Sequence, residues 1–383
     1  MNPNSHLPNL DREAYLSWLE IDLAAIRHNY RFLRNHVAPE SALYAVIKAD
    51  AYGHGAVEVA SALLQEGVSQ FCVARVEEAA ELRNAGINTP VLVLAPPFAG
   101  QARAAARLGV SIVVCDPAHV HAVAEAQQHT GQTIGVHIKT DVGMGRLGLP
   151  PEDVKALVTL CDQQRVPVDG IMAHLPCADA SSYAPTEVLV SRFRDLQNEI
   201  GEAYPGRRMI FHVANSAATL RSADAWLDAV RCGISLYGQF PSVEMERGYD
   251  LRPAMTLKSR ISYIKDVPAG TPISYGYTYT TPAPARLATV PLGYADGYPR
   301  QASNNADFLV HGKAAPQVGR VCMDQVVLDI SSIAGAKIGD EVVAFGIVQD
   351  AVLRPEDVAA RFGSIGYELT TRIGKRLPRF YTS

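Results

Sequence analysis

The apolar residues follow a regular rhythm between residues 43 and 235. Short apolar, β-branched runs, typical of buried strands, alternate with longer segments whose apolar side chains recur at three- and four-residue steps, as in amphipathic helices. The predicted strands are Leu43 to Ile47, Gln70 to Ala74, Val91 to Leu94, Ser111 to Cys115, Ile134 to Lys139, Asp169 to Ala173, Met209 to Val213 and Ala229 to Ser235. The main helices predicted between them are Ala56 to Gln65, Val76 to Asn84, Gln101 to Leu108, Ala118 to Gln128, Glu152 to Gln163 and Val188 to Glu202.

Strands that alternate with helices are normally parallel, and eight such units over about 200 residues predict a closed (β/α)8 barrel of the TIM type. An open doubly wound sheet is the alternative, but no GxGxxG motif follows any of the strands. Ahead of the barrel, Trp18 to Ile21 is predicted to be a strand, and Asp22 is a suitable N-cap for a helix. That helix would bury the stripe Leu23, Ile26, Tyr30, Leu33 and Val37.

The helical periodicity ends near Phe240, where β-branched runs punctuated by Pro and Gly begin. These runs are Thr256 to Val267, Leu287 to Pro291, Ala315 to Cys322, Gln325 to Ile330 and Glu341 to Phe345. They predict a mostly β C-terminal domain. We therefore expect a barrel domain over residues 1–239 and a β-rich domain over 240–383, with roughly the first 20 residues packed against the second.

Composition narrows the function classes. The 383 residues are 48% hydrophobic with a net charge of −4, and without a basic run they do not favour nucleic acid or an anionic membrane as partner. We expect a cytoplasmic protein, because the sequence has no apolar run of membrane-spanning length and no signal-peptide pattern at its start. The six cysteines lack CxxC or other zinc spacing, which predicts free thiols and no metal site.

Lys48 is the first candidate for chemistry. It ends the predicted strand Leu43 to Ile47 and opens the loop ADAYGHG, in which Tyr52 and His54 lie. Apolar neighbours would desolvate its amine, and the neutral amine is the form that attacks a carbonyl to form an imine. The structural alternative is a lysine that only snorkels at a strand end.

Other polar residues follow the ends of other predicted strands. They are Lys139 and Arg146 in KTDVGMGRLG, His174 in MAHLP, Asn215 and Ser216 in HVANSAA, and Arg231 and Gly233 in VRCGISLYG. The carboxyl ends of barrel strands meet at one mouth, where catalytic residues lie. Singly, these residues have structural explanations, such as a core histidine, a helix N-cap or surface ion pairs.

Ser216 and Gly233 follow the last two strands, where barrels often bind phosphate through backbone N–H groups and a helix N-terminus. A phosphate site beside an imine-forming lysine suggests pyridoxal phosphate as a cofactor.

Six motifs together resemble one family. AVIKADAYGHG, DVGMGRLG, HVANSAA, VRCGISLYG, GYADGYPR and GRVCMDQ occur in this order and resemble alanine racemase, a fold-type III pyridoxal phosphate enzyme. The resemblance extends from Leu19 to Tyr381. It implies a homodimer with shared active sites that converts L-alanine and D-alanine into each other and supplies D-alanine for peptidoglycan.

The resemblance also implies roles for individual residues. Lys48 is expected to hold the cofactor and act as one of two bases, and Tyr275, in ISYGYTYT, to act as the other base from a second subunit. The residues expected to bind the cofactor or its phosphate are Tyr52, Asn215, Ser216, Gly233, Ile234 and Tyr367.

Further roles concern the cofactor ring and the substrate. Arg231 is expected to face the pyridine nitrogen with His174 behind it, and Arg146 to bind the phenolic oxygen and the substrate carboxylate. Lys139 would support Arg146 and is carbamylated in some members. The residues expected to arrive with Tyr275 from the partner are Cys322, Met323 and Asp324, with Met323 touching the substrate.

Two bases on opposite faces of the cofactor suit racemisation, which removes a proton from one face of Cα and returns it on the other. Tyr275 would need neighbours that stabilise its phenolate, since a free tyrosine has a pKa of about 10. Arg231 can only donate to the pyridine nitrogen, so the nitrogen stays unprotonated. The weaker electron sink should favour reprotonation over transamination.

Two residues depart from the family pattern, Val142 for threonine in DTGMGR and Cys232 for proline in VRPGISLYG. Both departures leave open how specific the protein is for alanine over other amino acids. The alternatives are a racemase of broader specificity that accepts serine or lysine, a fold-type III amino acid decarboxylase, and a non-catalytic pyridoxal phosphate carrier. The motif around Lys48 and the arginine at 231 disfavour the decarboxylase, and the β domain disfavours the carrier.

Overall fold

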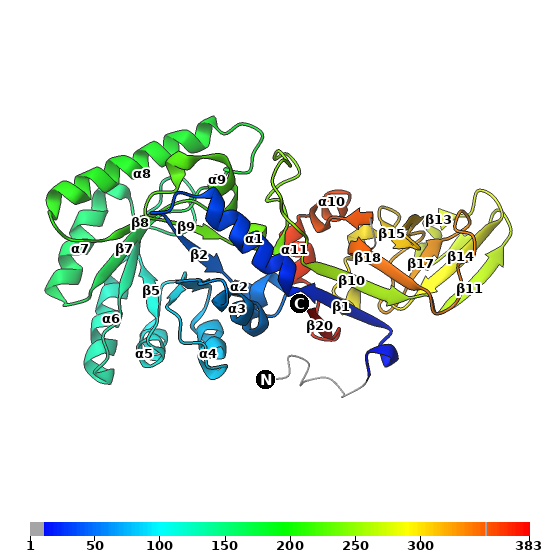
Figure 1. The fold of residues 1–383 in the computed structure, drawn as a ribbon, viewed down its shortest axis with the longest axis horizontal. Coiled ribbons are helices and arrows are strands. Elements are labelled where there is room, and N and C mark those ends of the chain that lie inside the picture. The colour runs from blue at the N-terminus through cyan, green and yellow to red at the C-terminus, as the bar shows by residue number, and fades with distance from the viewer. Residues whose placement is uncertain (1–10, 349–350) are drawn as a thin grey trace.

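The computed structural model describes residues 11–348 and 351–383, which form a parallel barrel followed by mostly antiparallel sheets (Figure 1). The barrel sheet has eight strands in the order β8-β7-β6-β5-β4-β3-β2-β9. Because β9 pairs with β2 and also lies next to β8, the sheet curls round on itself. The predicted (β/α)8 barrel is confirmed.

The elements of the barrel agree closely with the predicted ones. Its strands are β2 (Ala42–Val46), β3 (Phe71–Val73), β4 (Val91–Val93), β5 (Ser111–Val114), β6 (Val136–Lys139), β7 (Val168–Met172), β8 (Ile210–His212) and β9 (Ala229–Cys232). Its helices are α3 (Ala56–Leu64), α4 (Val76–Asn84), α5 (Ala99–Leu108), α6 (Pro117–Thr130), α7 (Val154–Gln163), α8 (Ala184–Ala203) and α9 (Ser216–Arg221). The segment labelled α2 (Lys48–Tyr52), predicted as the end of a strand and a loop, is a left-handed turn. Most boundaries differ from the prediction by only a few residues.

The beginning and the end of the described chain meet in one sheet. Strand β1 (Ser17–Asp22) pairs antiparallel with β10 (Met255–Arg260) and parallel with β20 (Arg379–Thr382). It leads directly into α1 (Leu23–His36), which lies against the barrel (Figure 1). Residues 1–10, part of the segment predicted to pack against the second domain, lie outside the described residues.

The second half is mostly β, as predicted, but its details differ. The remaining strands are β11 (Tyr263–Val267), β12 (Pro272–Ile273), β13 (Tyr279–Thr280), β14 (Ala285–Val290), β15 (Asp307–Val310), β16 (Lys313–Pro316), β17 (Val326–Asp329), β18 (Glu341–Val348) and β19 (Ala351–Leu353). The run predicted as one strand over Thr256 to Val267 forms β10 and β11, which belong to different sheets.

Two more differences have local physical causes. The strand predicted over Ala315 to Cys322 ends at Pro316, because Gly319 takes a positive φ of 77° and the chain turns into a loop. Two helices, α10 (Pro355–Ala360) and α11 (Gly366–Thr371), were not predicted. Six residues are too few to show a helical period in the sequence.

We predict that Asp22→Ala lowers the free energy of unfolding by about 1 kcal/mol. The Asp22 carboxylate accepts from the Ala25 amide at 2.9 Å and so caps α1 where the chain passes from the C-terminal sheet to the barrel. Thermal unfolding followed by circular dichroism measures the effect. Asp22→Asn keeps an acceptor and should unfold near the wild-type temperature; equal losses in both variants would contradict the capping role.

Candidate active site

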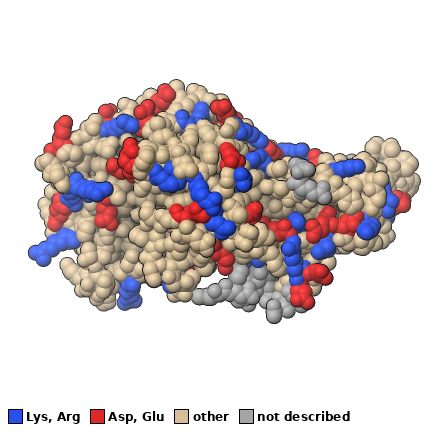
Figure 2. All heavy atoms as spheres, in the orientation of Figure 1, with Lys and Arg blue, Asp and Glu red and all other residues tan. Residues whose placement is uncertain are grey.

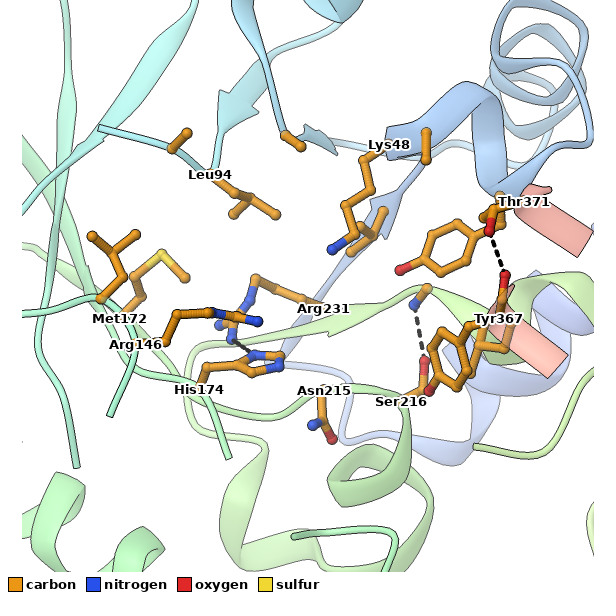
Figure 3. Close-up of a pocket in the computed structure, with 18 of the residues that line it drawn as sticks. Lys48, Leu94, Arg146, Met172, His174, Asn215, Ser216, Arg231, Tyr367 and Thr371 are labelled. Carbon is orange, nitrogen blue, oxygen red and sulfur yellow. Dashed lines mark hydrogen bonds between the residues drawn. The ribbon is translucent and has the colours of Figure 1, made fainter. Parts of the chain in front are cut away.

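A cavity of about 690 Å³ lies at the carboxyl ends of the barrel strands. Its walls come from the barrel and also from α11 of the second half. The predicted site residues that line it are Lys48, Tyr52, Lys139, Arg146, His174, Asn215, Ser216, Arg231, Gly233, Ile234 and Tyr367. In Figure 3, Lys48, Arg146 and Arg231 approach one another across this space, with Ser216 and Tyr367 at its opposite end.

Lys48 lies at the start of an unusual turn. The four residues Ala49 to Tyr52 all have φ between 52° and 54°, so they form a left-handed turn without any glycine. Such a conformation costs roughly 1–2 kcal/mol per residue, because Cβ crowds the following carbonyl oxygen. Strain of this size persists only where the surroundings hold it, and it concentrates at functional sites.

Positive charge dominates the cavity wall. Lys48, Lys139, Arg146 and Arg231 line it, against the single carboxylate of Glu368. Burial, and next the positive charge of Arg146, lower the pKa of Lys48. Burial and the charges of Arg231 and Arg146 lower the pKa of Lys139 to about 8. The cavity therefore favours an anionic ligand and amines that lose their protons readily.

Arg231, on β9, is buried, and its hydrogen-bond partners are imidazoles and backbone carbonyls. Its Nη1 donates to Nδ1 of His212 at 2.7 Å and its Nη2 to the Ala173 carbonyl at 2.7 Å. His174 Nδ1 lies 3.5 Å from Nη2, as shown by a dashed line in Figure 3. Burial lowers the pKa of Arg231 to about 10 and holds the pKa of His212 and of His174 well below the usual value.

These contacts determine which ring nitrogen of each imidazole carries the hydrogen. A guanidinium can only donate, so Nδ1 of His212 accepts and its Nε2 carries the hydrogen. That Nε2 lies 2.8 Å from Nδ1 of His137, which is therefore the acceptor. Sequence reasoning missed His212 and His137, although both lie on predicted strands. The alternation of side chains along a short buried strand does not reveal which one meets an arginine.

The loop that carries Arg146 is built on Asp141. The Asp141 carboxylate accepts from the amides of Gly143, Met144 and Gly145, at 2.9, 2.7 and 2.7 Å. These backbone hydrogen bonds lower the pKa of Asp141 despite the opposing effect of burial. The neighbouring Val142, one of the two departures from the family pattern, is buried beneath the loop.

The end of the cavity nearest α9 (Ser216–Arg221) presents hydroxyl and amide groups. The Gly233 amide donates to the Ser216 hydroxyl oxygen at 2.9 Å, and Asn215, rather than Ser216, caps the helix by accepting from the Ala218 amide. A Cβ on Gly233 would lie 2.3 Å from the Tyr52 hydroxyl oxygen, so only glycine allows this close approach. The phenols of Tyr52 and Tyr367 complete this end.

Pyridoxal phosphate fits this arrangement. Its phosphate needs hydrogen-bond donors, which the hydroxyls and amides around Ser216 and Gly233 supply. Its aldehyde needs an amine that loses its proton readily, which Lys48 offers. The excess of basic side chains over acidic ones matches the negative charge of the cofactor.

The remaining predicted residues lie elsewhere within this chain. Tyr275 and Cys322 line a separate hollow of about 420 Å³ with Ser274, Gly276 and Tyr277. The Tyr275 side chain is 71% exposed and Met323 is 53% exposed. Asp324 forms an ion pair with Arg376 at 2.7 Å. A single chain therefore does not bring these residues into the cavity around Lys48.

Several apolar residues that line the cavity were not predicted from the sequence. They are Leu94, Leu147, Met172 and Ile365. Leucine, methionine and isoleucine occur throughout the core, so nothing in the sequence separates these four from structural residues. Cys232, the second departure, lies fully buried on β9, and burial raises the pKa of its thiol to about 12.

The surface and the other side chains add few candidates for a functional site. On the face shown in Figure 2, lysine and arginine are interspersed with aspartate and glutamate. Within residues 11–348 and 351–383, no three His, Cys, Asp or Glu side chains are placed to hold a metal ion. No helix in this same part of the chain is long and apolar enough to cross a membrane.

Two family models match the chain, "Alanine racemase, N-terminal domain" over residues 21–241 and "Alanine racemase, C-terminal domain" over residues 254–381. Among curated proteins, the chain is 43% identical over 370 residues to an alanine racemase of Desulforamulus reducens, which covers 95% of this chain and 98% of the relative. It is 40% identical to an alanine racemase of Desulfosudis oleivorans, with 96% and 97% covered.

Solved structures give the same result. Alanine racemase from Streptomyces coelicolor superposes with a TM-score of 0.91 at 38% identity, covering 97% of this chain and 99% of the other. Alanine racemase from Bartonella henselae, solved with covalently bound pyridoxal phosphate, gives a TM-score of 0.86 at 28% identity, with 96% and 100% covered.

We predict that Lys139→Met raises the free energy of unfolding at pH 7 by at most roughly 3 kcal/mol. The comparison is made on protein from which bound small molecules have been removed. The buried lysine must stay charged below its folded pKa of about 8, against an ordinary value of 10.5. Between these two pH values the unfolded chain binds more protons at Lys139 than the folded chain does, so the stability of the wild type rises with pH. The methionine variant has no proton to lose there and lacks this rise in stability.

Unfolding by urea at pH 7, 8, 9 and 10 measures the difference between the two proteins. It should shrink steadily as the pH rises. A constant difference would mean that Lys139 keeps an ordinary pKa.

Proposed function

This chain belongs to the alanine racemase family and interconverts L-alanine and D-alanine, and we propose that it does so with pyridoxal phosphate and two bases. The observation that supports the mechanism most strongly is the position of Lys48. Its half-buried amine, with a lowered pKa, points into a cavity whose other end is lined with hydroxyl and amide groups. D-alanine made in this way would supply peptidoglycan.

We propose that Lys48 holds the cofactor, which is covalently bound in the Bartonella relative. Ser216, Gly233, Ile234, Tyr52 and Tyr367 would bind its phosphate, with Asn215 fixing the start of α9 beside them. This assignment is supported by the hydroxyl and amide donors that converge at one end of the cavity.

Arg231 would donate to the pyridine nitrogen. All its contacts with His212, His174 and backbone carbonyls leave it a pure donor, so the nitrogen keeps its lone pair. The imidazole chain through His212 to His137 fixes the guanidinium plane. Bound pyridoxal phosphate supplies an electron sink for the Cα of the amino acid, and an unprotonated ring makes that sink weak, which favours return of the proton.

Arg146 would bind the substrate carboxylate and Lys139 would support it. Two cations side by side repel each other, so this pairing needs a change of charge at Lys139. With a pKa of about 8, part of the amine is unprotonated at neutral pH, which is the form that carbon dioxide carbamylates. A carbamate there would give Arg146 a negatively charged neighbour.

We propose that the active form is a dimer with shared sites. Within one chain the cavity has Lys48 on one side, whereas Tyr275 lies on an exposed loop in a different hollow. Tyr275 of the partner subunit would supply the second base, accompanied by Cys322, Met323 and Asp324 of the partner subunit. Lys48 and that tyrosine would then exchange protons with opposite faces of Cα.

Broader specificity is the second candidate. Leu94 and Met172 limit the cavity beside Lys48 and Arg146, yet a volume of about 690 Å³ also has room for larger amino acids. Val142 and Cys232 are both buried and outside the lining of the cavity, so an influence on specificity would be indirect.

We predict that the purified protein with pyridoxal phosphate abolishes the optical rotation of L-alanine rapidly and that of L-serine and L-lysine much more slowly. Alanine has the smallest side chain of the three and needs the least room beside Leu94 and Met172. Polarimetry with each substrate measures the rates. Comparable rates would mean a broad racemase, and release of carbon dioxide without loss of L-alanine rotation would mean a decarboxylase.

We predict that Lys48→Ala and Tyr275→Phe are each inactive alone, yet regain about a quarter of wild-type activity per site when coexpressed. Random assortment makes half of the dimers hybrid, and each hybrid has one site with both native bases. Polarimetry of the unseparated mixture tests this value. Hybrids isolated through two different affinity tags by tandem purification should regain about half of the wild-type activity per site. If Tyr275 acted within its own chain, the hybrids would be inactive.

A further inference from the structure

The left-handed turn after Lys48 joins two residues of the cavity. Lys48 precedes the turn and Tyr52 is its last residue, and both line the cavity. The turn contains alanine and aspartate at positions where glycine would be unstrained. Local hydrogen bonds close the turn, among them those from the Ala51 amide to the Ile47 carbonyl at 2.9 Å and from the Gly53 amide to the Ala49 carbonyl at 3.0 Å. Contacts from outside the turn add to them.

Glu78, on α4 (Val76–Asn84), makes the contact nearest to Lys48. One carboxylate oxygen accepts from the Ala49 amide at 2.7 Å. The other accepts from the amides of Ala74 and Arg75, at 2.6 and 3.0 Å, where the chain leaves β3. One carboxylate thus ties the residue after Lys48 to the rigid end of the neighbouring barrel strand.

The opposite side of the turn meets the end of the chain. Arg379 Nε donates to the Gly53 carbonyl at 2.9 Å. A Cβ on Gly53 would lie 2.3 Å from the Thr370 carbonyl oxygen of α11, so the backbone is closely packed there. The turn is therefore held between Glu78 on the barrel side and the C-terminal segment on the other.

We propose that Glu78 is a positioning residue that holds the strained turn and so keeps Lys48 and Tyr52 in place for the cofactor. The proposal rests on the proposed function, in which Lys48 holds pyridoxal phosphate. Glu78 itself lies outside the lining of the cavity, so it acts through the Ala49 amide.

Glu78 also affects Lys48 electrostatically. The positive charges of Arg146 and Arg231 lower the pKa of Lys48, whereas the charges of Glu78 and Cys72 raise it. Since burial raises the pKa of the Cys72 thiol to about 12, Cys72 is neutral at ordinary pH and Glu78 is the effective counter-charge. Loss of that charge should lower the pKa of Lys48 further.

Glu78→Gln removes the negative charge and one of the two acceptor oxygens. A carboxamide has one acceptor, and two amides at Ala74 and Arg75 compete for it with the one at Ala49. The Ala49 amide then faces an NH2 group, and the turn loses its tie. We expect hydrogen exchange at the amides of Ala51 and Gly53 to become about tenfold faster in the full-length chain without cofactor.

The same variant should bind pyridoxal phosphate about tenfold more weakly, as measured by fluorescence titration, and should lower kcat more than KM for alanine. Glu77→Gln is the matched control. It is the neighbouring residue on the same first turn of α4 but is exposed, and both measurements should stay at wild-type values.

Ala49→Gly provides the second test. Glycine takes positive φ without a Cβ clash, so it lowers the strain that Glu78 is proposed to offset. Adding Ala49→Gly to Glu78→Gln should slow the exchange at Ala51 and Gly53 again and restore most of the cofactor affinity. A loss of affinity caused only by a weakened α4 N-terminus would not respond to this change.

Three results would overturn the proposal. They are unchanged exchange at Ala51 and Gly53 in Glu78→Gln, faster exchange with unchanged cofactor affinity, and an effect that Ala49→Gly fails to reverse. Failure of the proposed function is recognised separately, because wild type and Glu77→Gln would then not bind pyridoxal phosphate, while the exchange measurement would still report on the turn.

Discussion

Concentrated positive charge in a partly closed cavity is the constraint on which the rest of this structure depends. Lys48, Lys139, Arg146 and Arg231 face one space that contains a single carboxylate, Glu368, and Glu368 itself pairs with Arg372 at 3.1 Å. Buried charge is costly unless it is hydrogen-bonded or paired. The fold meets this requirement with neutral acceptors for Arg231 and leaves the balancing negative charge to be supplied by what binds.

The choice of neutral acceptors has a chemical consequence. Carbonyls and imidazoles accept hydrogen bonds from the guanidinium of Arg231 without cancelling its charge. The guanidinium therefore remains a hydrogen-bond donor and keeps its positive electric field in the cavity. An aspartate at His212 would neutralise the arginine and alter the electron demand on any ring placed against it. The pKa values of Lys48 and Lys139 are lowered by burial and also by the positive charges of Arg146 and Arg231. The same arrangement of charges thus sets the electrostatics of the cofactor pocket and lowers the pKa of its lysine amines.

The sequence predicted the barrel well, because eight apolar strands alternating with amphipathic helices permit few topologies. It also placed Lys48, Arg146 and Ser216 at strand ends, and the structure brings their side chains to one cavity. His212 and Glu78 could not be predicted in the same way. Each acts through hydrogen bonds to residues distant in the chain, His212 to Arg231 and His137 and Glu78 to Ala49, and no local pattern encodes those partners. The helix carrying Tyr367 was also missed, since six residues show no period.

The two halves of the chain cannot be separated without loss of the cavity. Strand β1 joins the C-terminal sheet before the barrel begins, and β20 returns to pair with it at the end of the chain. Between them, α11 places Tyr367 in the cavity wall, and Arg379, the first residue of β20, donates to the turn that follows Lys48. The barrel therefore supplies the four basic groups, whereas the C-terminal segment helps to hold the strained backbone that presents one of them. A cavity built in this way depends on the docking of both halves, even though every lysine and arginine that lines it comes from the barrel.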